Sequence, residues 1–139
     1  MGERFEVIEH TADVGIAAYG ADLKEAFANA AYGLFSLMTD IDSVGDNVRR
    51  DVEVTADNRE ELLVAWLSEL IYFFEVEGVL FSRFDIAELG EMRLKAGCCG
   101  EKIDPRRHRI KMGVKAVTYH MTQVEEGDDG CRVQVLFDI

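Results

Sequence analysis

The sequence predicts an α+β domain in which a mixed or antiparallel β-sheet packs against two main helices. Its strand-like runs are grouped instead of alternating regularly with helices, which disfavours a doubly wound parallel sheet. Two segments with helical periodicity begin with capping patterns, and an acidic, glycine-containing turn separates the last two strand-like runs. At 139 residues, 48% hydrophobic and 30% charged, the chain fits one domain, 1–139, with its own core.

Both predicted helices carry the same start signal. Asp22 is a good N-cap and Glu25 occupies the capping-box position, and Asp57 and Glu60 repeat this pattern. Apolar residues then follow at helical spacing: Leu23, Phe27, Ala30, Ala31, Leu34 and Met38 in the first helix, and Leu63, Trp66, Leu67, Leu70, Ile71 and Phe74 in the second. We expect the second helix to end near Gly78 and both stripes to face the core.

The remaining apolar runs predict β-strands. These runs are 5–8, 14–19, 48–54, 79–86, 92–96, 114–124 and 131–139. The segment 125–130, Glu-Glu-Gly-Asp-Asp-Gly, is a strong turn signal and predicts that the last two strands form a hairpin.

The hairpin allows a prediction of register. If Val124 pairs with Cys131, Lys115 becomes a diagonal neighbour of Asp138, about 7–8 Å away between Cα atoms. One face then holds Lys115, Val117, Tyr119 and Met121 with Arg132, Gln134, Leu136 and Asp138. The opposite face holds Thr118 and His120 with Val133, Val135 and Phe137. A slip of one residue would reverse these assignments.

Charge and cysteine content restrict the function. The net charge is −12, from 27 acidic and 15 basic side chains. We therefore expect any role near RNA to depend on a protein partner, and not on an extended RNA-binding surface of this chain. The chain has no apolar run of membrane-spanning length and no secretory signal. Its three cysteines lack CxxC spacing, so we expect reduced, mostly buried thiols and a cytoplasmic location.

One basic segment stands out in this acidic chain. It surrounds Pro105 and contains Lys102, Arg106, Arg107, Arg109 and Lys111. Such a segment is commonly a solvated loop. The alternative is a docking point for an acidic partner or an RNA phosphate.

The end of the chain suggests a cation site. The last strand runs into Asp138 and Ile139, which would hold a side-chain carboxylate and the α-carboxylate side by side. Ca²⁺ and Mg²⁺ prefer such oxygen ligands, and Asp13 can add a third carboxylate, with Lys115 or His10 nearby. The alternative is a solvated acidic end and an ordinary turn.

Other chemistries find less support. The cysteines and histidines form no structural zinc pattern, and no common glycine-rich phosphate loop is present. His10, His108 and His120 have no nucleophile motif nearby, and His120 reads as a hydrogen-bonded structural residue. A hydrolase that uses Asp13 and Asp138 as paired carboxylates stays open.

Five segments together resemble the archease family. They are 10–15 (HTADVG), 25–27 (EAF), 62–70 (LLVAWLSEL), 115–120 (KAVTYH) and 137–139 (FDI), and they run in order over nearly the whole chain. Each is weak alone, whereas HTAD, KAVTYH and FDI together are highly specific. Gly113-Val114 departs from the acidic residue and isoleucine that the family usually has before its lysine.

The resemblance implies an accessory protein of the manganese- and GTP-dependent RNA ligase in tRNA splicing. Archeases promote guanylylation of the ligase's active-site histidine and support multiple turnover. Carried over by motif, the metal ligands fall on Asp13, Asp138 and Ile139, and the functional lysine on Lys115. His10 and His120 are further candidates for activating the partner.

The resemblance thus implies a non-enzymatic activator with a divalent cation. Ca²⁺ is the first expectation, with Mg²⁺ or Mn²⁺ as alternatives, and RNA is contacted only through the ligase. Two other functions stay open: a metal-dependent phosphohydrolase using Asp13 and Asp138, and a chaperone-like binding module.

Overall fold

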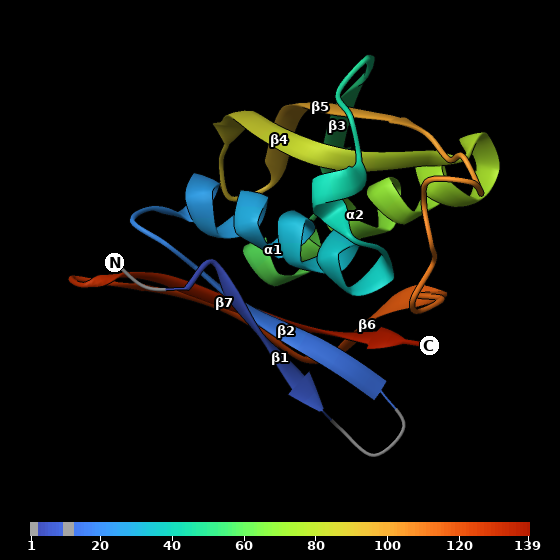
Figure 1. Cartoon of the computed structure of the whole chain (residues 1–139). Helices are drawn as coiled ribbons and strands as arrows, with labels where there is room; N and C mark the ends of the chain where they lie inside the picture. Colours follow the sequence, from blue (N-terminus) through green and yellow to red (C-terminus); the bar gives the residue numbers. More distant parts are fainter. Residues whose placement is uncertain (1–2, 10–12) are drawn as a thin grey trace.

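A computed structural model describes residues 3–9 and 13–139, and it arranges the chain in three layers. A four-stranded sheet of order β1-β2-β7-β6 forms one outer layer and a three-stranded sheet of order β3-β5-β4 forms the other, with the helices between them (Figure 1). The elements are β1 (Phe5–Glu9), β2 (Asp13–Gly20), α1 (Leu23–Met38), η1 (Ile41–Ser43), β3 (Val48–Thr55), α2 (Arg59–Tyr72), η2 (Phe73–Glu77), β4 (Val79–Leu89), β5 (Arg93–Lys102), β6 (Ala116–Gly127) and β7 (Gly130–Asp138).

The predicted α+β class with two main helices is confirmed. All strand pairs of the two sheets are antiparallel, so the strands that we expected in one sheet are divided between two. The helices bury an apolar stripe on each side, which gives both sheets a hydrophobic surface to pack against.

The helix starts agree with the capping prediction in one case and differ in the other. The Asp22 side chain accepts a hydrogen bond from the Glu25 N–H at 2.8 Å, as predicted. In the second helix, the prediction of Asp57 as cap with Glu60 is wrong by one residue. Asn58 is the cap and accepts from the Glu61 N–H at 2.9 Å. An asparagine caps as well as an aspartate does, so adjacent Asp and Asn leave the sequence ambiguous.

The second helix ends where the sequence predicts. After Tyr72 it continues as one π-helical turn, η2, and stops at Gly78. Gly78 has a φ of +68°, the left-handed conformation that glycine adopts without a steric penalty.

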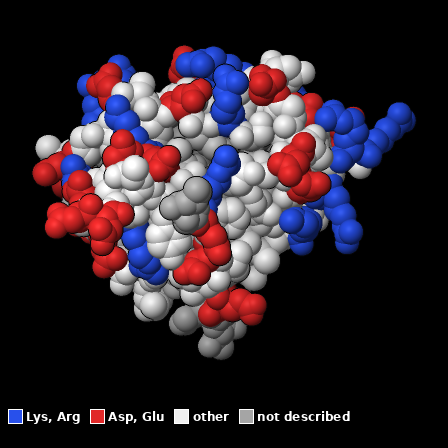
Figure 2. Space-filling view, turned by 60° about the vertical axis from the view of Figure 1, so that its left-hand side comes forward, with Lys and Arg blue, Asp and Glu red and all other residues white. Residues whose placement is uncertain are grey.

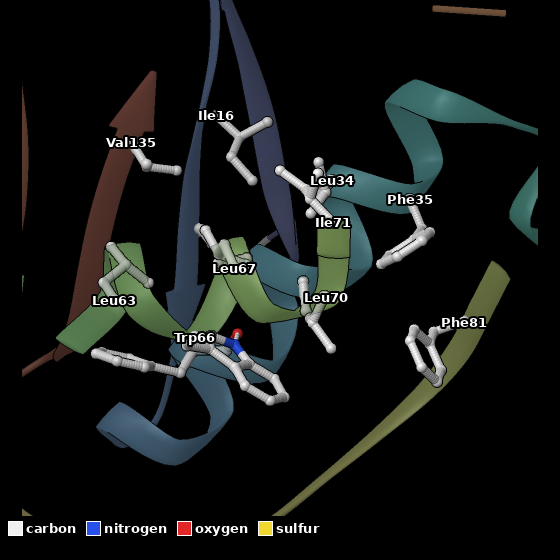
Figure 3. Packing of buried hydrophobic residues seen from close by; sticks show 14 of the residues in the cluster. Ile16, Leu34, Phe35, Leu63, Trp66, Leu67, Leu70, Ile71, Phe81 and Val135 are labelled. Atoms are coloured by element: carbon white, nitrogen blue, oxygen red, sulfur yellow. Dashed lines mark hydrogen bonds between the residues drawn. The ribbon is translucent and has the colours of Figure 1, made fainter. Parts of the chain in front are cut away.

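The core lies between the two sheets and is filled by side chains of both α1 and α2. Leu63, Leu67 and Leu70 point from α2 toward its neighbours, with Ile16 and Val135 on one side and Phe81 on the other (Figure 3). Trp66 is fully buried, and its indole N–H donates to the Phe27 carbonyl at 3.0 Å, which ties the two helices together. No helix in the described part of the chain is long and apolar enough to cross a membrane.

The three cysteines are buried free thiols, in agreement with the sequence prediction. Burial raises the pKa of Cys98 to about 12 and also raises the pKa of Cys131. Both thiols therefore stay protonated, and hence weakly nucleophilic, at neutral pH.

The register predicted for the last hairpin is wrong. Val124 pairs with Val133, and the turn between the two strands contains only Asp128 and Asp129. Nearer the chain end the ladder shifts, so that Thr118 pairs with Leu136 and Ala116 with Asp138. The prediction assumed one continuous ladder, which the strand does not have.

An enlarged β-bulge causes this shift. Four residues of β6, 119–122, stand opposite the single residue Val135. Met121 has a φ of +58°, and its carbonyl accepts a hydrogen bond from Gln134 Nε2 at 3.0 Å. Val117 therefore shares the face of Phe137, not that of Leu136 and Asp138, and Thr118 does not lie on the face of Phe137.

Candidate cation site at the paired strand ends

The beginning of β2 and the end of β7 bring two carboxylates together. Asp13 and Asp138 are register partners in the antiparallel pair. Directly opposite residues point to the same face, with Cα atoms about 4.5–5.5 Å apart. Asp13 is partly buried, Asp138 is exposed, and Ile139 follows with 46% of its surface exposed.

The neighbouring pair anchors these strand ends. Val14 and Phe137 are register partners on the opposite face, with exposures of 5% and 0%, and both belong to the core. Because side chains alternate along a strand, burial of this pair directs Asp13 and Asp138 away from the core. The carboxylates thus lie on a fixed backbone.

Two opposed carboxylates repel each other unless a cation lies between them. Within residues 3–9 and 13–139, no three His, Cys, Asp or Glu side chains are grouped closely enough to hold a metal ion. A cation at Asp13 and Asp138 therefore needs further oxygen ligands. Water and a partner's phosphate groups are chemically suitable, because Mg²⁺ is commonly held by one or two carboxylates together with water and phosphate.

Gly15 allows β2 and β7 to approach closely beside this pair. Gly15 is the partner of Leu136, and a Cβ built on it would collide with Leu136 Cδ2 and lie 2.7 Å from the Val135 carbonyl oxygen. Leu136 is fully buried across the glycine. The close approach of Leu136 to Gly15 therefore requires a residue without a side chain.

Gly15→Ala is expected to lower the free energy of unfolding by about 1–3 kcal/mol, the usual cost of overpacking. Urea denaturation followed by circular dichroism measures the change. Gly113→Ala is the matched control, because a Cβ there meets nothing within 4 Å. Equal stability of the two variants would contradict the close-packing argument.

The backbone of Lys115 contacts Asp138. Its N–H donates to the Asp138 carbonyl at 2.8 Å. The partner of Asp138 on the same face is Ala116, so the predicted placement of Lys115 and Asp138 on one face is wrong. The extra residues of the bulge are the reason, since they reverse which positions share a face.

The structure describes only one of the two candidate histidines, His120. His10 lies outside the described residues. His120 lies in the bulge, is exposed, and its backbone N–H donates to Thr118 Oγ1 at 3.2 Å. The bulge stands opposite Val135, three positions before Asp138, which is roughly 10 Å along the strand.

Glu101 is the centre of a buried polar cluster that no sequence motif predicted. Glu101 accepts hydrogen bonds from the Gly45 N–H at 2.8 Å, from Arg107 Nη2 at 2.7 Å and from His108 Nε2 at 2.8 Å. The Asp104 N–H donates to His108 Nδ1 at 2.8 Å, which makes Nε2 the donor toward Glu101. Arg107 and the Gly45 N–H lower the pKa of Glu101 to about 2.

This cluster, together with α1, holds the β5–β6 loop, residues 103–115. The Thr39 hydroxyl at the end of α1 donates to the Arg109 carbonyl at 2.8 Å, and the Lys111 N–H donates to the Met38 carbonyl at 2.7 Å. The loop has no helix or strand of its own, yet it is fastened at several points. The only sequence signal was the spacing of Glu101 from Arg107 and His108 across Pro105.

A separate cleft of about 1130 Å³ lies at the other end of β2 and β7. It is lined in part by Gly20, Gly130 and Cys131, from the strand ends remote from Asp13 and Asp138. Neither carboxylate lines it, so the candidate cation site lies outside that cleft.

Comparison with known proteins gives consistent matches over the chain's length. The model of the Archease protein family (MTH1598/TM1083) matches residues 5–139. "Protein archease" of Methanosarcina acetivorans is 42% identical over 143 aligned positions, covering 100% of this chain and 98% of that protein. "Protein archease" of Thermococcus gammatolerans is 43% identical over 131 positions, covering 91% and 92%.

Two solved structures share the fold. The solution structure of protein 1598 of Methanobacterium thermoautotrophicum is 37% identical, with a TM-score of 0.82, covering 98% of this chain and 99% of that chain. The crystal structure of an archease from Thermotoga maritima, named there a possible chaperone, is 20% identical with a TM-score of 0.65 over 100% of both chains.

Proposed function

Because this chain belongs to the archease family, we propose that it is an accessory protein of the GTP- and metal-dependent tRNA-splicing RNA ligase. It promotes guanylylation of the ligase and supports its multiple turnover, and it has no turnover of its own. The activity resides in the cytoplasm, and RNA is reached through the ligase.

The observation that carries this proposal is the facing pair Asp13 and Asp138 at the outer end of the four-stranded sheet. The pair supplies two hard oxygen ligands for Ca²⁺, Mg²⁺ or Mn²⁺, and the Ile139 α-carboxylate supplies a third. An exposed site at a strand end can enter a partner's cleft without any rearrangement of the core. Lys115 lies beside this site, because its backbone N–H donates to the Asp138 carbonyl.

Charge supports a protein partner whose own cleft handles phosphates. The net charge of this chain is −12, whereas a cleft that binds nucleotides and RNA is usually positive. Complementary charge speeds encounter and fixes orientation more than it adds affinity. The association is therefore expected to weaken as salt concentration rises.

The direct test adds the purified protein to its own organism's ligase with GTP and Mn²⁺ and measures the rate of covalent guanylylation. We expect faster guanylylation and more than one turnover per ligase. If the protein is instead a chaperone-like module, as the Thermotoga maritima structure is named, it would preserve folded ligase without changing the rate per active ligase. Substitutions at Asp13 and Asp138 would then be tolerated.

A short extension after Ile139 tests the role of the α-carboxylate. Adding two glycines keeps every side chain but moves the terminal charge away from Asp138. We expect weaker cation binding by calorimetry and slower guanylylation of the ligase. The same dipeptide added before Met1 is the control. Cation affinity unchanged by the C-terminal extension would mean that Ile139 supplies no ligand.

A further inference from the structure

Arg106 and Arg109 differ from all other arginines of the chain. Arg49, Arg50, Arg59, Arg83, Arg93, Arg107 and Arg132 form ion pairs, and Arg4 lies over the Tyr32 ring, with its Cζ 4.2 Å from the ring centroid. Among residues 3–9 and 13–139, only the side chains of Arg106 and Arg109 have no such partner. Both are exposed and both lie in the β5–β6 loop.

Two exposed lysines extend this basic surface. Lys111 and Lys115 belong to the same loop, and their side chains make no ion pair within the described part of the chain. The only acidic residue in the loop is Asp104, whose carboxylate accepts from the Arg106 N–H at 3.0 Å. A protein with 27 acidic residues thus keeps four cations without a carboxylate partner in one loop.

The loop is fastened in place, so these cations are held on a defined backbone. Glu101 holds Arg107 and His108, and α1 holds the backbone at Arg109 and Lys111. The cost of ordering the loop backbone is therefore met on folding and is not left for binding. Figure 1 shows the loop descending along one side of the molecule from β5 to β6, beside the C-terminus. Figure 2 shows basic groups projecting at one edge of the visible face, whereas acidic groups are spread over much of the rest.

An exposed aromatic residue follows the loop along the chain. Tyr119 begins the bulge of β6 and is 67% exposed. It follows Lys115 by four residues, about 13 Å of extended strand. Arginine and lysine side chains near an accessible aromatic ring are the combination that binds single-stranded nucleic acid, through phosphate contacts and base stacking. An acidic peptide would use the cations but has no need for the ring.

We propose that Arg106, Arg109, Lys111 and Lys115, with Tyr119, form a contact surface for single-stranded RNA. This goes beyond the proposed function and replaces its indirect contact with RNA, through the ligase, by a direct one. The four cations bind successive phosphates, and Tyr119 stacks on a base. The overall negative charge restricts this binding to the one loop, because RNA is repelled by the acidic surface elsewhere.

The test uses the purified protein alone with a fluorescent oligouridylate of about 12 nucleotides, within the usual site size of roughly 4–16. Fluorescence anisotropy gives the affinity at several salt concentrations. Removing three phosphate contacts with Arg106→Gln, Arg109→Gln and Lys111→Gln should lower affinity about tenfold or more at low salt. The slope of log K against log salt should become shallower by about 2, since each contact to a single strand contributes about 0.7.

A charge-matched variant is the control. Arg49→Gln, Arg93→Gln and Lys95→Gln remove the same net charge from β3 and β5 and should leave affinity within about twofold of the unmodified protein. Tyr119→Ala should weaken binding about fivefold or more. Tyr72→Ala, at a site 52% exposed on α2, should have no effect.

Three results would overturn the proposal. They are no saturable binding of oligouridylate at low salt, equal losses in the two triple variants, and displacement of the RNA by polyglutamate as readily as by unlabelled oligouridylate. The last result would identify an acidic protein segment as the ligand. No ligase is present in this experiment, so its failure leaves the guanylylation test unaffected, and the reverse also holds.

Discussion

Asp138→Asn is expected to abolish stimulation of ligase guanylylation, and Asp13→Asn to reduce it severely. Each change replaces a charged oxygen ligand with a neutral amide while keeping its shape. Loss of a direct ligand should lower cation affinity by more than the roughly 10–100-fold that follows loss of a residue that only orients one. Calorimetric titration with Ca²⁺, Mg²⁺ and Mn²⁺, beside the guanylylation assay, measures both effects.

Without a bound cation, Asp138→Asn should stabilise the fold. Because Asp13 and Asp138 are directly opposed, neutralising one removes a repulsion and should stabilise the fold by about 0.2–1 kcal/mol. The unmodified protein should gain melting temperature when cation is added, and Asp138→Asn should lose that gain. Asp129→Asn, in the hairpin turn at the other end of β7, is the control. A cation-induced gain that persists in Asp138→Asn would contradict the site.

Glu101→Ala is expected to destabilise the protein by about 1–3 kcal/mol, because it leaves the Gly45 N–H and the buried His108 without their acceptor. Arg107 is half-exposed and keeps the Ser43 carbonyl as an acceptor, so its loss is smaller. Glu101→Gln should cost less, since its amide oxygen still accepts one hydrogen bond. Urea denaturation at neutral pH measures both. Asp104→Ala, which removes only an acceptor for the Arg106 N–H, is the milder control.

The stability that Glu101 provides should also depend on pH. Arg107 and the Gly45 N–H lower its pKa in the folded protein to about 2, from an ordinary value of 4.5. A carboxyl whose pKa falls on folding stabilises the native state fully above the ordinary value, and this contribution disappears as pH falls through the folded value. The difference between the unmodified protein and Glu101→Gln should therefore shrink between about pH 4.5 and pH 2. A constant difference across that range would contradict the assigned partners.

Local signals in the sequence predicted much of the fold. The first helix starts at its predicted cap, the second ends at its predicted glycine, and each predicted strand region contains a strand. These features depend on neighbouring residues, so periodicity and capping chemistry suffice. The cap at Asn58 was missed because Asp57 is equally suitable by type.

Long-range relations were predicted less well. The hairpin register depends on a bulge of four residues against one, for which the strand-like composition of 114–124 gives no sign. The Glu101 cluster joins Gly45 to residues more than fifty positions later, and such a contact leaves no periodic pattern. Asp13 and Asp138 face each other because β2 pairs with β7, more than a hundred residues later in the chain. The family motifs, and not the spacing of these residues, indicated that the two carboxylates belong to one site.

The bulge in β6 also limits how this strand can change in length. Val117 and Val124 are seven positions apart, an odd interval, yet both pack against the core. In an unbroken strand an odd interval places residues on opposite faces, so the bulge exchanges inward and outward positions midway along β6. A single-residue insertion or deletion in the regular ladder on either side of 119–122 would turn Val117 or Val124 away from the core. The unpaired residues 119–122 are therefore the part of β6 that can absorb a change in length.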